Sequence, residues 1–316
     1  MTQLKISLFG KFSIESEGLS LRELESYKVQ EFFCYLLLHR TRPHARETLA
    51  NLLWGDSTTA QSKKYLRQAL WQLQNTLAQE DAPEAERFLL VEPDWIRLNM
   101  RSDIWLDIEV FEQAFALVRG RPSHSLSAED VMILKEAVAL YRGDLLEGSY
   151  QDWCLYERER LQHMYMVLLD KITGFCEREQ DYETGLNYAT VIMRYDRARE
   201  CTHRRLMRLY YLAGDRTSAL RQYERCVTAL REELGVKPAR RTVELYEQIR
   251  RDAFVVGPAP SSAQSRPAPT AVETASPASL PEVIVRLREL QSLLTEIHRQ
   301  VQQEIKTAEL VFNRWQ

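Results

Sequence analysis

The 316-residue chain lacks the long apolar runs of a membrane protein. Its longest apolar runs, such as Phe32–Leu38, are far shorter than the roughly 20 residues that a bilayer-spanning helix needs. Its first residues, Met1–Lys5, show none of the charged, apolar and small-residue segments of a secretory signal peptide. We therefore expect a cytoplasmic protein with no membrane partner.

Cysteine is sparse, and its spacing excludes the common metal and redox motifs. The five cysteines form no CxxC pair, and the six histidines form neither an HxxxH nor an HExxH arrangement. The sequence also has no GxxxxGK[ST] phosphate loop, no GxGxxG fingerprint and no GxSxG elbow. We therefore expect no metal, no cofactor and no catalytic residue, and we interpret the chain as a protein other than an enzyme.

The chain also lacks a net positive charge, since 42 lysines and arginines stand against 45 acids and the formal net charge is −3. A nucleic acid meets only one face of a protein, however, so local charge matters more than the total. Residues 57–79 contain no acid but include Lys63, Lys64 and Arg67. This stretch is the first candidate for a nucleic-acid contact.

Residues 1–104 show the element order of a winged helix-turn-helix domain with an additional N-terminal sheet. Leu4, Ile6 and Leu8 alternate with polar residues, which predicts a strand. Helices are expected over Val29–His39, Arg46–Trp54 and Thr59–Gln79, followed by a β-hairpin of Phe88–Val91 and Trp95–Leu98.

Residues 105–254 are almost entirely helical in pattern, and they contain a weak internal repeat. The segment from Asp181 to Leu186 aligns with the segment from Asp215 to Leu220 at an offset of 34 residues, the length of a tetratricopeptide unit. We therefore expect a tetratricopeptide-like helical domain, and an irregular helical bundle is the alternative. The predicted fold class is mostly α with a small β component.

Beyond these domains we expect a flexible linker over 255–281 and a C-terminal amphipathic helix over 282–316. The linker is rich in Pro, Ala and Ser, and the helix shows a heptad pattern. We interpret the helix as a coiled coil that forms a homodimer, with docking on its own domain or on a partner as the alternative. The expected dimerisation residues are Leu287, Leu290, Leu294, Ile297 and Val301.

One face of the helix expected over Thr59–Gln79 has the side chains that read DNA. Leucines at positions 66, 70, 73 and 77 form a narrow stripe that faces the core. The opposite face combines basic residues, which suit phosphates or guanine, with amides, which suit adenine edges. The candidate DNA-binding residues are Lys63, Lys64, Arg67, Gln68, Trp71 and Asn75 on this helix, with Arg46 before it and Arg97 on the hairpin.

The combination of motifs resembles the SARP-type bacterial regulators, and its later half resembles their bacterial transcriptional activator domain. The similar segments are Leu8–Gly10, Arg46–Trp54, Leu66–Leu73, Leu140–Leu146, Trp153 with Glu157–Leu161, and Glu233–Pro238. The resemblance implies an OmpR-like winged helix that binds direct-repeat promoter DNA and a helical domain that assists recruitment of RNA polymerase. It also implies that the Lys63–Trp71 segment lies on the recognition helix.

One departure from the family leaves other functions open. Family members usually carry arginines late in the recognition helix, where this chain has Gln72, Gln74 and Asn75. One alternative is therefore a protein-interaction module whose winged helix has lost DNA binding. Another is a basic groove in the helical domain, although helix salt bridges explain most of its arginines. The groove residues would be Arg204, Arg205, Arg208, Arg221 and Arg225.

Overall fold

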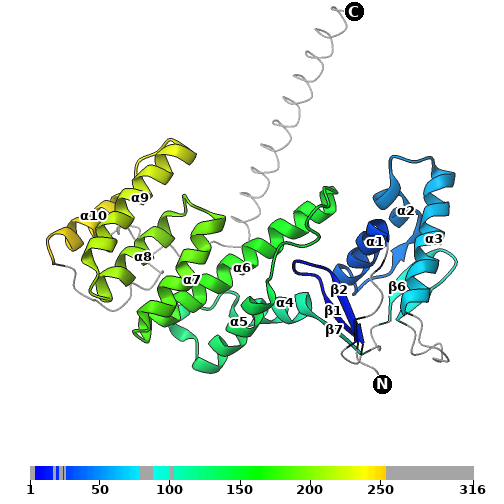
Figure 1. The fold of residues 1–316 in the computed structure, drawn as a ribbon, viewed down its shortest axis with the longest axis horizontal. Helices are drawn as coiled ribbons and strands as arrows, with labels where there is room; N and C mark the ends of the chain where they lie inside the picture. Colours follow the sequence, from blue (N-terminus) through cyan, green and yellow to red (C-terminus); the bar gives the residue numbers. More distant parts are fainter. Residues whose placement is uncertain are drawn as a thin grey trace, which may run out of the picture. The chain divides into compact units, whose positions relative to one another are not determined.

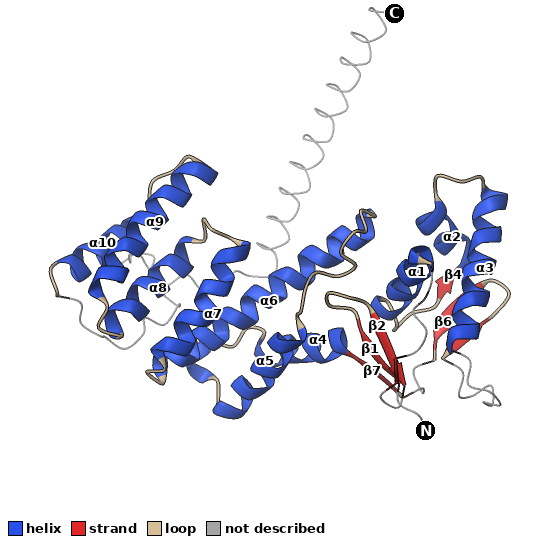
Figure 2. Cartoon of the chain, viewed as in Figure 1, coloured by secondary structure: helices blue, strands red, loops and turns tan. Residues whose placement is uncertain are grey.

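The computed structural model of the chain describes residues 4–16, 19–20, 24, 26–77, 88–99 and 103–253. Most of these residues are helical. The strands, all of which lie before residue 107, form two small sheets (Figure 1, Figure 2). The predicted fold class is therefore confirmed. The expected linker, C-terminal helix and dimerisation residues lie outside the described residues. None of the helices in the described ranges is long and apolar enough to cross a membrane.

The N-terminal sheet has the strand order β3-β2-β1-β7. Its strands are β1 (Leu4–Ser7), β2 (Ser13–Ser16), β3 (Leu19–Ser20) and β7 (Ile104–Leu106), and β7 pairs in parallel with β1. In β1, Leu4 and Ile6 are buried and Lys5 is exposed, because alternate side chains point to opposite faces of a sheet. The strand predicted from this alternation is confirmed.

A helix-turn-helix unit follows, with a hairpin as its wing. The helices are α1 (Tyr27–Leu38), α2 (Arg46–Trp54) and α3 (Thr59–Leu77); the second sheet consists of β4 (His44–Ala45), β5 (Leu89–Val91) and β6 (Trp95–Leu98). β6 is the central strand and pairs in antiparallel fashion with both neighbours. The predicted helix bounds agree closely, although α1 begins at Tyr27 and not at Val29. We call residues up to β7 the winged domain.

The helical domain consists of seven helices within 107–250, each of which contacts the next along the chain. They are α4 (Asp107–Val118), α5 (Ala128–Leu140), α6 (Asp152–Arg178), α7 (Tyr182–Tyr195), α8 (Glu200–Leu212), α9 (Arg216–Leu234) and α10 (Arg240–Arg250), with a 3₁₀ turn at Ser123–Ser125. Helices α6 and α7 are joined by a short turn, and so are α8 and α9, which gives the paired arrangement of a helical repeat (Figure 1).

The 34-residue repeat predicted from the sequence recurs in the structure. Asp181 and Asp215 are the N-caps of α7 and α9, and each side chain accepts a backbone hydrogen bond from the third residue of its helix. Gly185 and Ala219 occupy equivalent buried positions, and a Cβ on Gly185 would lie 3.4 Å from the side chain of Leu209. Small residues therefore stand where the helices of successive pairs approach closely, as in tetratricopeptide repeats.

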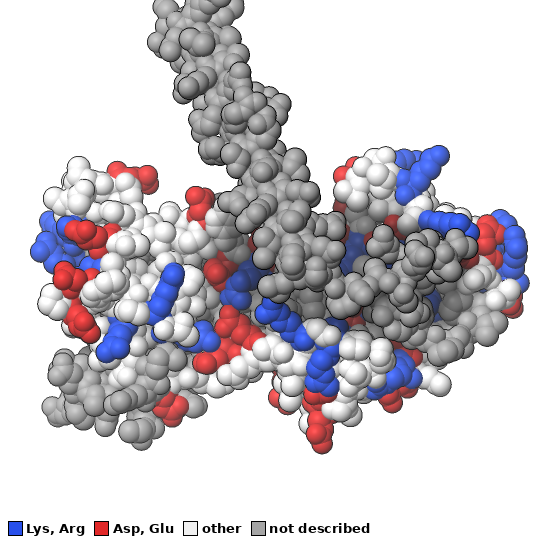
Figure 3. Space-filling model, turned by 180° about the vertical axis from the view of Figure 1, so that it is seen from behind, with Lys and Arg blue, Asp and Glu red and all other residues white. Residues whose placement is uncertain are grey.

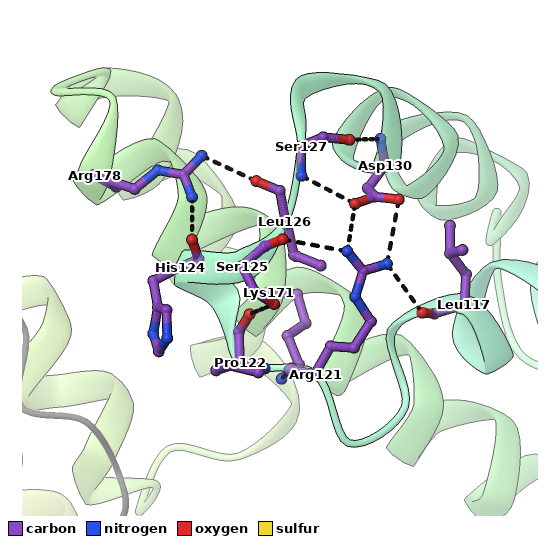
Figure 4. Close-up of polar contacts among 10 residues, drawn as sticks. All are labelled: Leu117, Arg121, Pro122, His124, Ser125, Leu126, Ser127, Asp130, Lys171 and Arg178. Atoms are coloured by element: carbon purple, nitrogen blue, oxygen red, sulfur yellow. Dashed lines mark hydrogen bonds and ion pairs between the residues drawn. The ribbon is translucent and has the colours of Figure 1, made fainter.

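A polar cluster holds the loop between α4 and α5 against α6 (Figure 4). The Arg121 guanidinium donates to the carboxylate of Asp130, which belongs to the capping box at the start of α5. Lys171 of α6 donates to the carbonyl oxygen of Arg121, and Arg178 of α6 donates to the carbonyl oxygens of His124 and Leu126 at 2.6 and 3.0 Å. The loop therefore has a defined conformation without a hydrophobic core of its own.

Two of the motifs that carry the family resemblance pack against each other where the winged and helical domains meet. Phe9 forms a β-bridge with Leu145, and the Gly10 N–H donates to the carbonyl oxygen of Asp144 at 3.3 Å. Gly10 has φ +74°, and a Cβ on it would lie 3.4 Å from the backbone of Arg142. Glycine is required here because of both its left-handed backbone and this close approach.

The Asp107 carboxylate ties the same motif to the start of α4. It is 2% exposed and accepts the backbone N–H groups of Leu8 at 2.8 Å, Phe9 at 3.0 Å and Ile108 at 2.7 Å. Burial raises the pKa of Asp107, although these backbone hydrogen bonds oppose the rise by stabilising the carboxylate. The strand end and the helix start are thus held by one side chain.

A second set of contacts joins α1 to the loop before α6. The Ser149 hydroxyl donates to the carboxylate of Glu31, which is 2% exposed, at 2.6 Å. Arg158 of α6 donates to the carbonyl oxygens of Leu145, Leu146 and Ser149. The described residues between 4 and 253 accordingly belong to one compact unit.

Candidate nucleic-acid interface

Helix α3 presents one buried and one exposed face, as the leucine periodicity predicts. Leucines 66, 70, 73 and 77 are between 0% and 6% exposed. The side chains expected to contact DNA are all exposed: Lys63, Lys64, Arg67, Gln68, Trp71 and Asn75. Trp71 is the most exposed large apolar residue of the helix, at 63%. No segment of the described residues therefore covers this face.

The start of α3 is set by the turn after α2. The Ser57 N–H donates to the carbonyl oxygen of Trp54 at 3.0 Å, and the Thr58 hydroxyl accepts the N–H of Gln61 at 3.4 Å. The Thr58 side chain thus satisfies an amide that the helix itself leaves without a partner. This turn fixes the direction of α3 relative to α2.

Although residues 57–79 contain no acid, one base of α3 has an acidic neighbour from another helix. Glu47, in the first turn of α2, forms an ion pair with Lys63 of α3, and both side chains are about half exposed or more. The hydrogen bond from Lys63 holds the pKa of Glu47 below its usual value, so the carboxylate is charged at neutral pH. The packing of α2 on α3 creates this pair.

Among the described residues, no acid lies within ion-pair distance of Lys64 or Arg67. Both are on the exposed face with Gln68 and Trp71, so α3 carries two unneutralised cations beside an amide and an indole. On the face of the molecule seen from behind, basic and acidic side chains are intermingled (Figure 3).

The two basic residues expected near the wing converge on the hairpin turn. Arg97 of β6 lies 3.9 Å from the carboxylate of Glu92, and the Arg46 guanidinium donates to the carbonyl oxygen of Glu92 at 3.4 Å. The Arg46 N–H also donates to the carbonyl oxygen of Asp94. The tip of the wing is therefore acidic, and Arg46 and Arg97 lie beside it.

Two exposed aromatic residues of the winged domain were not among the predicted site residues. Tyr65 of α3 is 40% exposed and its ring lies 6.5 Å from that of Trp54, and Trp95 at the start of β6 is 46% exposed. Large exposed aromatic side chains are common at interfaces. The signal in the sequence was the position of Tyr65 on the flank of the polar stripe.

The basic groove considered for the helical domain is largely neutralised by acids of α6. Arg205 lies 2.5 Å from the carboxylate of Asp170, and Arg208 donates to both carboxylate oxygens of Glu177 at 2.7 and 3.1 Å. Arg204 donates to Thr242 and lies 3.7 Å from Glu200. Ion pairs explain these three arginines, and for Arg205 and Arg208 the acid belongs to another helix, α6. Arg221 and Arg225 are exposed.

The described part of the chain contains no group of three or more side chains that could hold a metal ion. Four of the five cysteines are buried and Cys201 is exposed. Burial raises the pKa of Cys34 well above its usual range, which keeps the thiol protonated and unreactive.

Comparison with known proteins gives matches along both domains. Residues 106–250 match the bacterial transcriptional activator domain family. The chain is 25% identical over 256 residues to the transcriptional regulatory protein MoaR1 of Mycobacterium tuberculosis (strain ATCC 25618 / H37Rv), a match that covers 78% of this chain and 79% of that protein. The protein of the same name from Mycobacterium bovis (strain BCG / Pasteur 1173P2) is 24% identical over 252 residues, with the same coverage.

The fold is shared with a solved structure, that of Mycobacterium tuberculosis EmbR in complex with low affinity phosphopeptide. The TM-score is 0.63 at 19% sequence identity, and the match covers 81% of this chain and 67% of that one. At this identity the similarity concerns the fold. It extends over about as much of the chain as the structure describes.

Proposed function

Since the chain is a transcription regulator of the SARP type, with residues 106–250 belonging to the bacterial transcriptional activator domain family, we propose that it binds specific double-stranded promoter DNA through α3. In this proposal α3 enters the major groove and the β5–β6 hairpin lies along the backbone as the wing. The helical domain contacts RNA polymerase, so that the protein activates transcription from promoter repeats in the cytoplasm. The family is a class of regulators and not of enzymes.

The observation that carries the proposal is the exposed face of α3. Lys64 and Arg67 have no ion-pair partner among the described residues, and Gln68 and Asn75 lie on the same face. Cations on such a face neutralise phosphates or read guanine, and amides read adenine edges. Trp71 supplies an apolar contact for a thymine methyl group or a sugar.

The end of α3 limits the affinity for DNA, and the C-terminal residues would raise it. The polar residues that end α3, such as Gln74 and Asn75, offer fewer phosphate contacts than arginines would, which reduces affinity. Dimerisation through the C-terminal residues Leu290, Leu294 and Ile297 would compensate, because two linked winged domains bind adjacent repeats with avidity.

A second candidate function is a protein-interaction module whose winged domain no longer binds DNA. The observation that favours it is the combination of Trp71, 63% exposed, with Lys63 neutralised by Glu47. In that case the helical repeat binds a protein partner, and α3 contributes an apolar contact.

The test is a binding series of the full chain against a genomic DNA fragment library at increasing salt concentration. We expect saturable binding to fragments that contain repeats. The variant Lys64→Ala/Arg67→Ala should lose about 10-fold or more in affinity at moderate salt and show a shallower salt dependence, because each lost phosphate contact lowers the slope by about 0.9.

The matched control removes one exposed arginine and one exposed lysine of the helical domain in the variant Arg119→Ala/Lys135→Ala. This control changes the net charge by the same amount, and its affinity should stay close to that of the wild type. No enrichment of any fragment at low salt would contradict DNA binding and favour the interaction module.

A further inference from the structure

We propose that Glu47 and Glu92 set the strength of DNA binding by the winged domain, because by neutralising Lys63 and Arg97 they lower its sequence-independent affinity for the phosphate backbone. The inference rests on the proposed function and deepens it. It assigns a role to acids at a surface where only bases, amides and aromatic residues are expected to act.

The first acid lies between the two helices of the helix-turn-helix unit. Glu47 and Lys63 are far apart in sequence, and the packing of α2 on α3 brings Glu47 Oε1 within hydrogen-bond distance of Lys63 Nζ. Both side chains are well exposed, at 75% and 48%. Lys63 is therefore positioned for DNA but has an intramolecular anion beside it, whereas Lys64, the next residue, has none among the described residues.

The second acid repeats this arrangement on the wing. Glu92 lies in the turn between β5 and β6, and its carboxylate is 3.9 Å from the guanidinium of Arg97. Helix α3 and the wing, the two elements proposed to contact DNA, thus each carry one cation with an acid beside it. The exposed ion pairs themselves contribute little to stability, because water screens them. Their acids are therefore better explained by an effect on a charged ligand than by an effect on folding.

An acid beside a phosphate-contacting base acts in two ways. It competes with phosphate for the base, and its own charge repels the phosphate. Both effects apply equally to every DNA sequence, because the phosphate backbone is the same everywhere. Contacts made by Gln68, Trp71 and Asn75 to base edges are not weakened in this way. Affinity for every DNA sequence consequently falls by a similar factor, while discrimination between sequences stays with the base-edge contacts.

The experiment measures the affinity of the full chain for an enriched fragment and for a scrambled fragment of the same length, from low to moderate salt. For Glu47→Gln we expect an affinity for scrambled DNA about 3- to 10-fold higher at 0.1 M salt and a salt slope steeper by up to about 0.9. Affinity for the enriched fragment should rise by a similar factor, so the ratio of the two affinities stays near the wild-type value. Glu92→Gln should act in the same direction, and the double variant should combine both effects.

Three controls separate the charge of Glu47 from its structural role. Glu47→Asp keeps the charge and should behave like the wild type. Glu183→Gln removes an exposed acid from the same position, the first turn of a helix, in the helical domain, and should leave both affinities unchanged. In a Lys63→Ala background the gain from Glu47→Gln should shrink, because the base that Glu47 neutralises is absent.

The inference is overturned if Glu47→Gln and Glu183→Gln have the same affinities and salt slopes while the wild type binds DNA through Lys64 and Arg67. It is also overturned if Glu47→Gln raises the affinity for only one of the two fragments, since an effect on phosphate contacts acts on both. Failure of the wild type to bind any DNA at low salt is a different result, since it contradicts the proposed function itself.

Discussion

His203 belongs to the first turn of α8, is 2% exposed and packs against helix α9. Its Nε2 is 2.8 Å from the carbonyl oxygen of Arg197, and its Nδ1 is 2.8 Å from Nε2 of Gln222. A carbonyl oxygen can only accept, so Nε2 carries the proton and Nδ1 accepts from the Gln222 amide. Protonation of the ring would place a second donor opposite that amide, in a site that is closed to water.

Because burial lowers the pKa of His203, we predict that the helical domain loses stability as the pH falls. The unfolded chain takes up the proton near its usual pKa of about 6.5, whereas the folded chain takes it up at lower pH. The stabilising contribution is therefore complete above pH ~6.5 and is lost as the pH falls through the folded pKa. Urea unfolding at several pH values between about 5 and 8 measures it.

A flatter pH dependence is expected for the variant His203→Gln, which cannot titrate. Some slope should remain, since burial also lowers the pKa of His39 and His44. His124 is exposed, so His124→Gln should follow the wild-type curve. An unchanged slope in His203→Gln would show that the ring is not the group responsible.

Helix crossings in the repeat depend on side-chain size at equivalent positions. A Cβ added to Gly185 would lie 3.3 Å from Cβ of Cys176 and 3.4 Å from the side chain of Leu209. Space is therefore available for one methyl group at most. In the next pair, the equivalent position is Ala219, which is fully buried.

We predict that Gly185→Ala changes the free energy of unfolding by about 1 kcal/mol or less, because the gain in helix propensity offsets the tight contact. Gly185→Leu should destabilise the chain by about 1–3 kcal/mol or more, since the added carbons have no space between α6, α7 and α8. Denaturant unfolding of both variants measures the difference. Equal stabilities would mean that the helices can separate at this crossing without cost.

Elements with a local pattern were predictable, and elements held by distant contacts were not. The leucine spacing over Thr59–Gln79 and the Glu92–Asp94 turn between two apolar segments predicted helix α3 and the β5–β6 hairpin correctly. β7, in contrast, exists because Ile104–Leu106 pairs with Leu4–Ile6 across almost the whole winged domain, and no pattern within three residues indicates it. β4, with two residues, depends in the same way on β6.

The same distinction applies to the candidate interface. Which face of α3 is exposed follows from its periodicity, so the exposure of Lys64, Gln68 and Trp71 could be predicted. The partner of Lys63 could not, because Glu47 belongs to another helix and meets Lys63 only after α2 packs on α3. The exposure of a base can therefore be predicted from the periodicity of its own helix, whereas its charged neighbours can be identified only from the tertiary fold.

In the whole molecule, the hydrophobic core does not end at the boundary between the winged and helical domains. One cluster of buried residues runs from Leu4 through Phe33 and Phe111 to Leu168 and beyond. Its rings make contacts across the boundary: Phe9 lies 5.1 Å from Phe111, and Tyr35 of α1 lies 5.3 Å from Trp153 of α6. Such a continuous core predicts that the two domains unfold together.

The backbone approach at Gly10 provides a way to test this coupling. Gly10 has φ +74° and Gly120 has φ +76°, so valine is strained to the same degree at either position. Only at Gly10 would the side chain also meet a backbone, because Arg142 and Gly143 lie within 3.5 Å of a Cβ there, whereas nothing lies within 4 Å of a Cβ on Gly120. The difference between the two variants therefore reports on the contact between the domains.

We predict that Gly10→Val destabilises the chain by about 1–3 kcal/mol more than Gly120→Val, because the contact between the Gly10 loop and the Arg142–Leu145 loop is forced apart. Tryptophan fluorescence and far-ultraviolet circular dichroism should give coincident unfolding curves for the wild type and for Gly120→Val. In Gly10→Val the two curves should separate, since the winged domain then unfolds without the helical domain. Coincident curves and equal stabilities in both variants would mean that the domains are coupled by the core contacts of Phe9 and Tyr35, and that the approach at Gly10 contributes nothing.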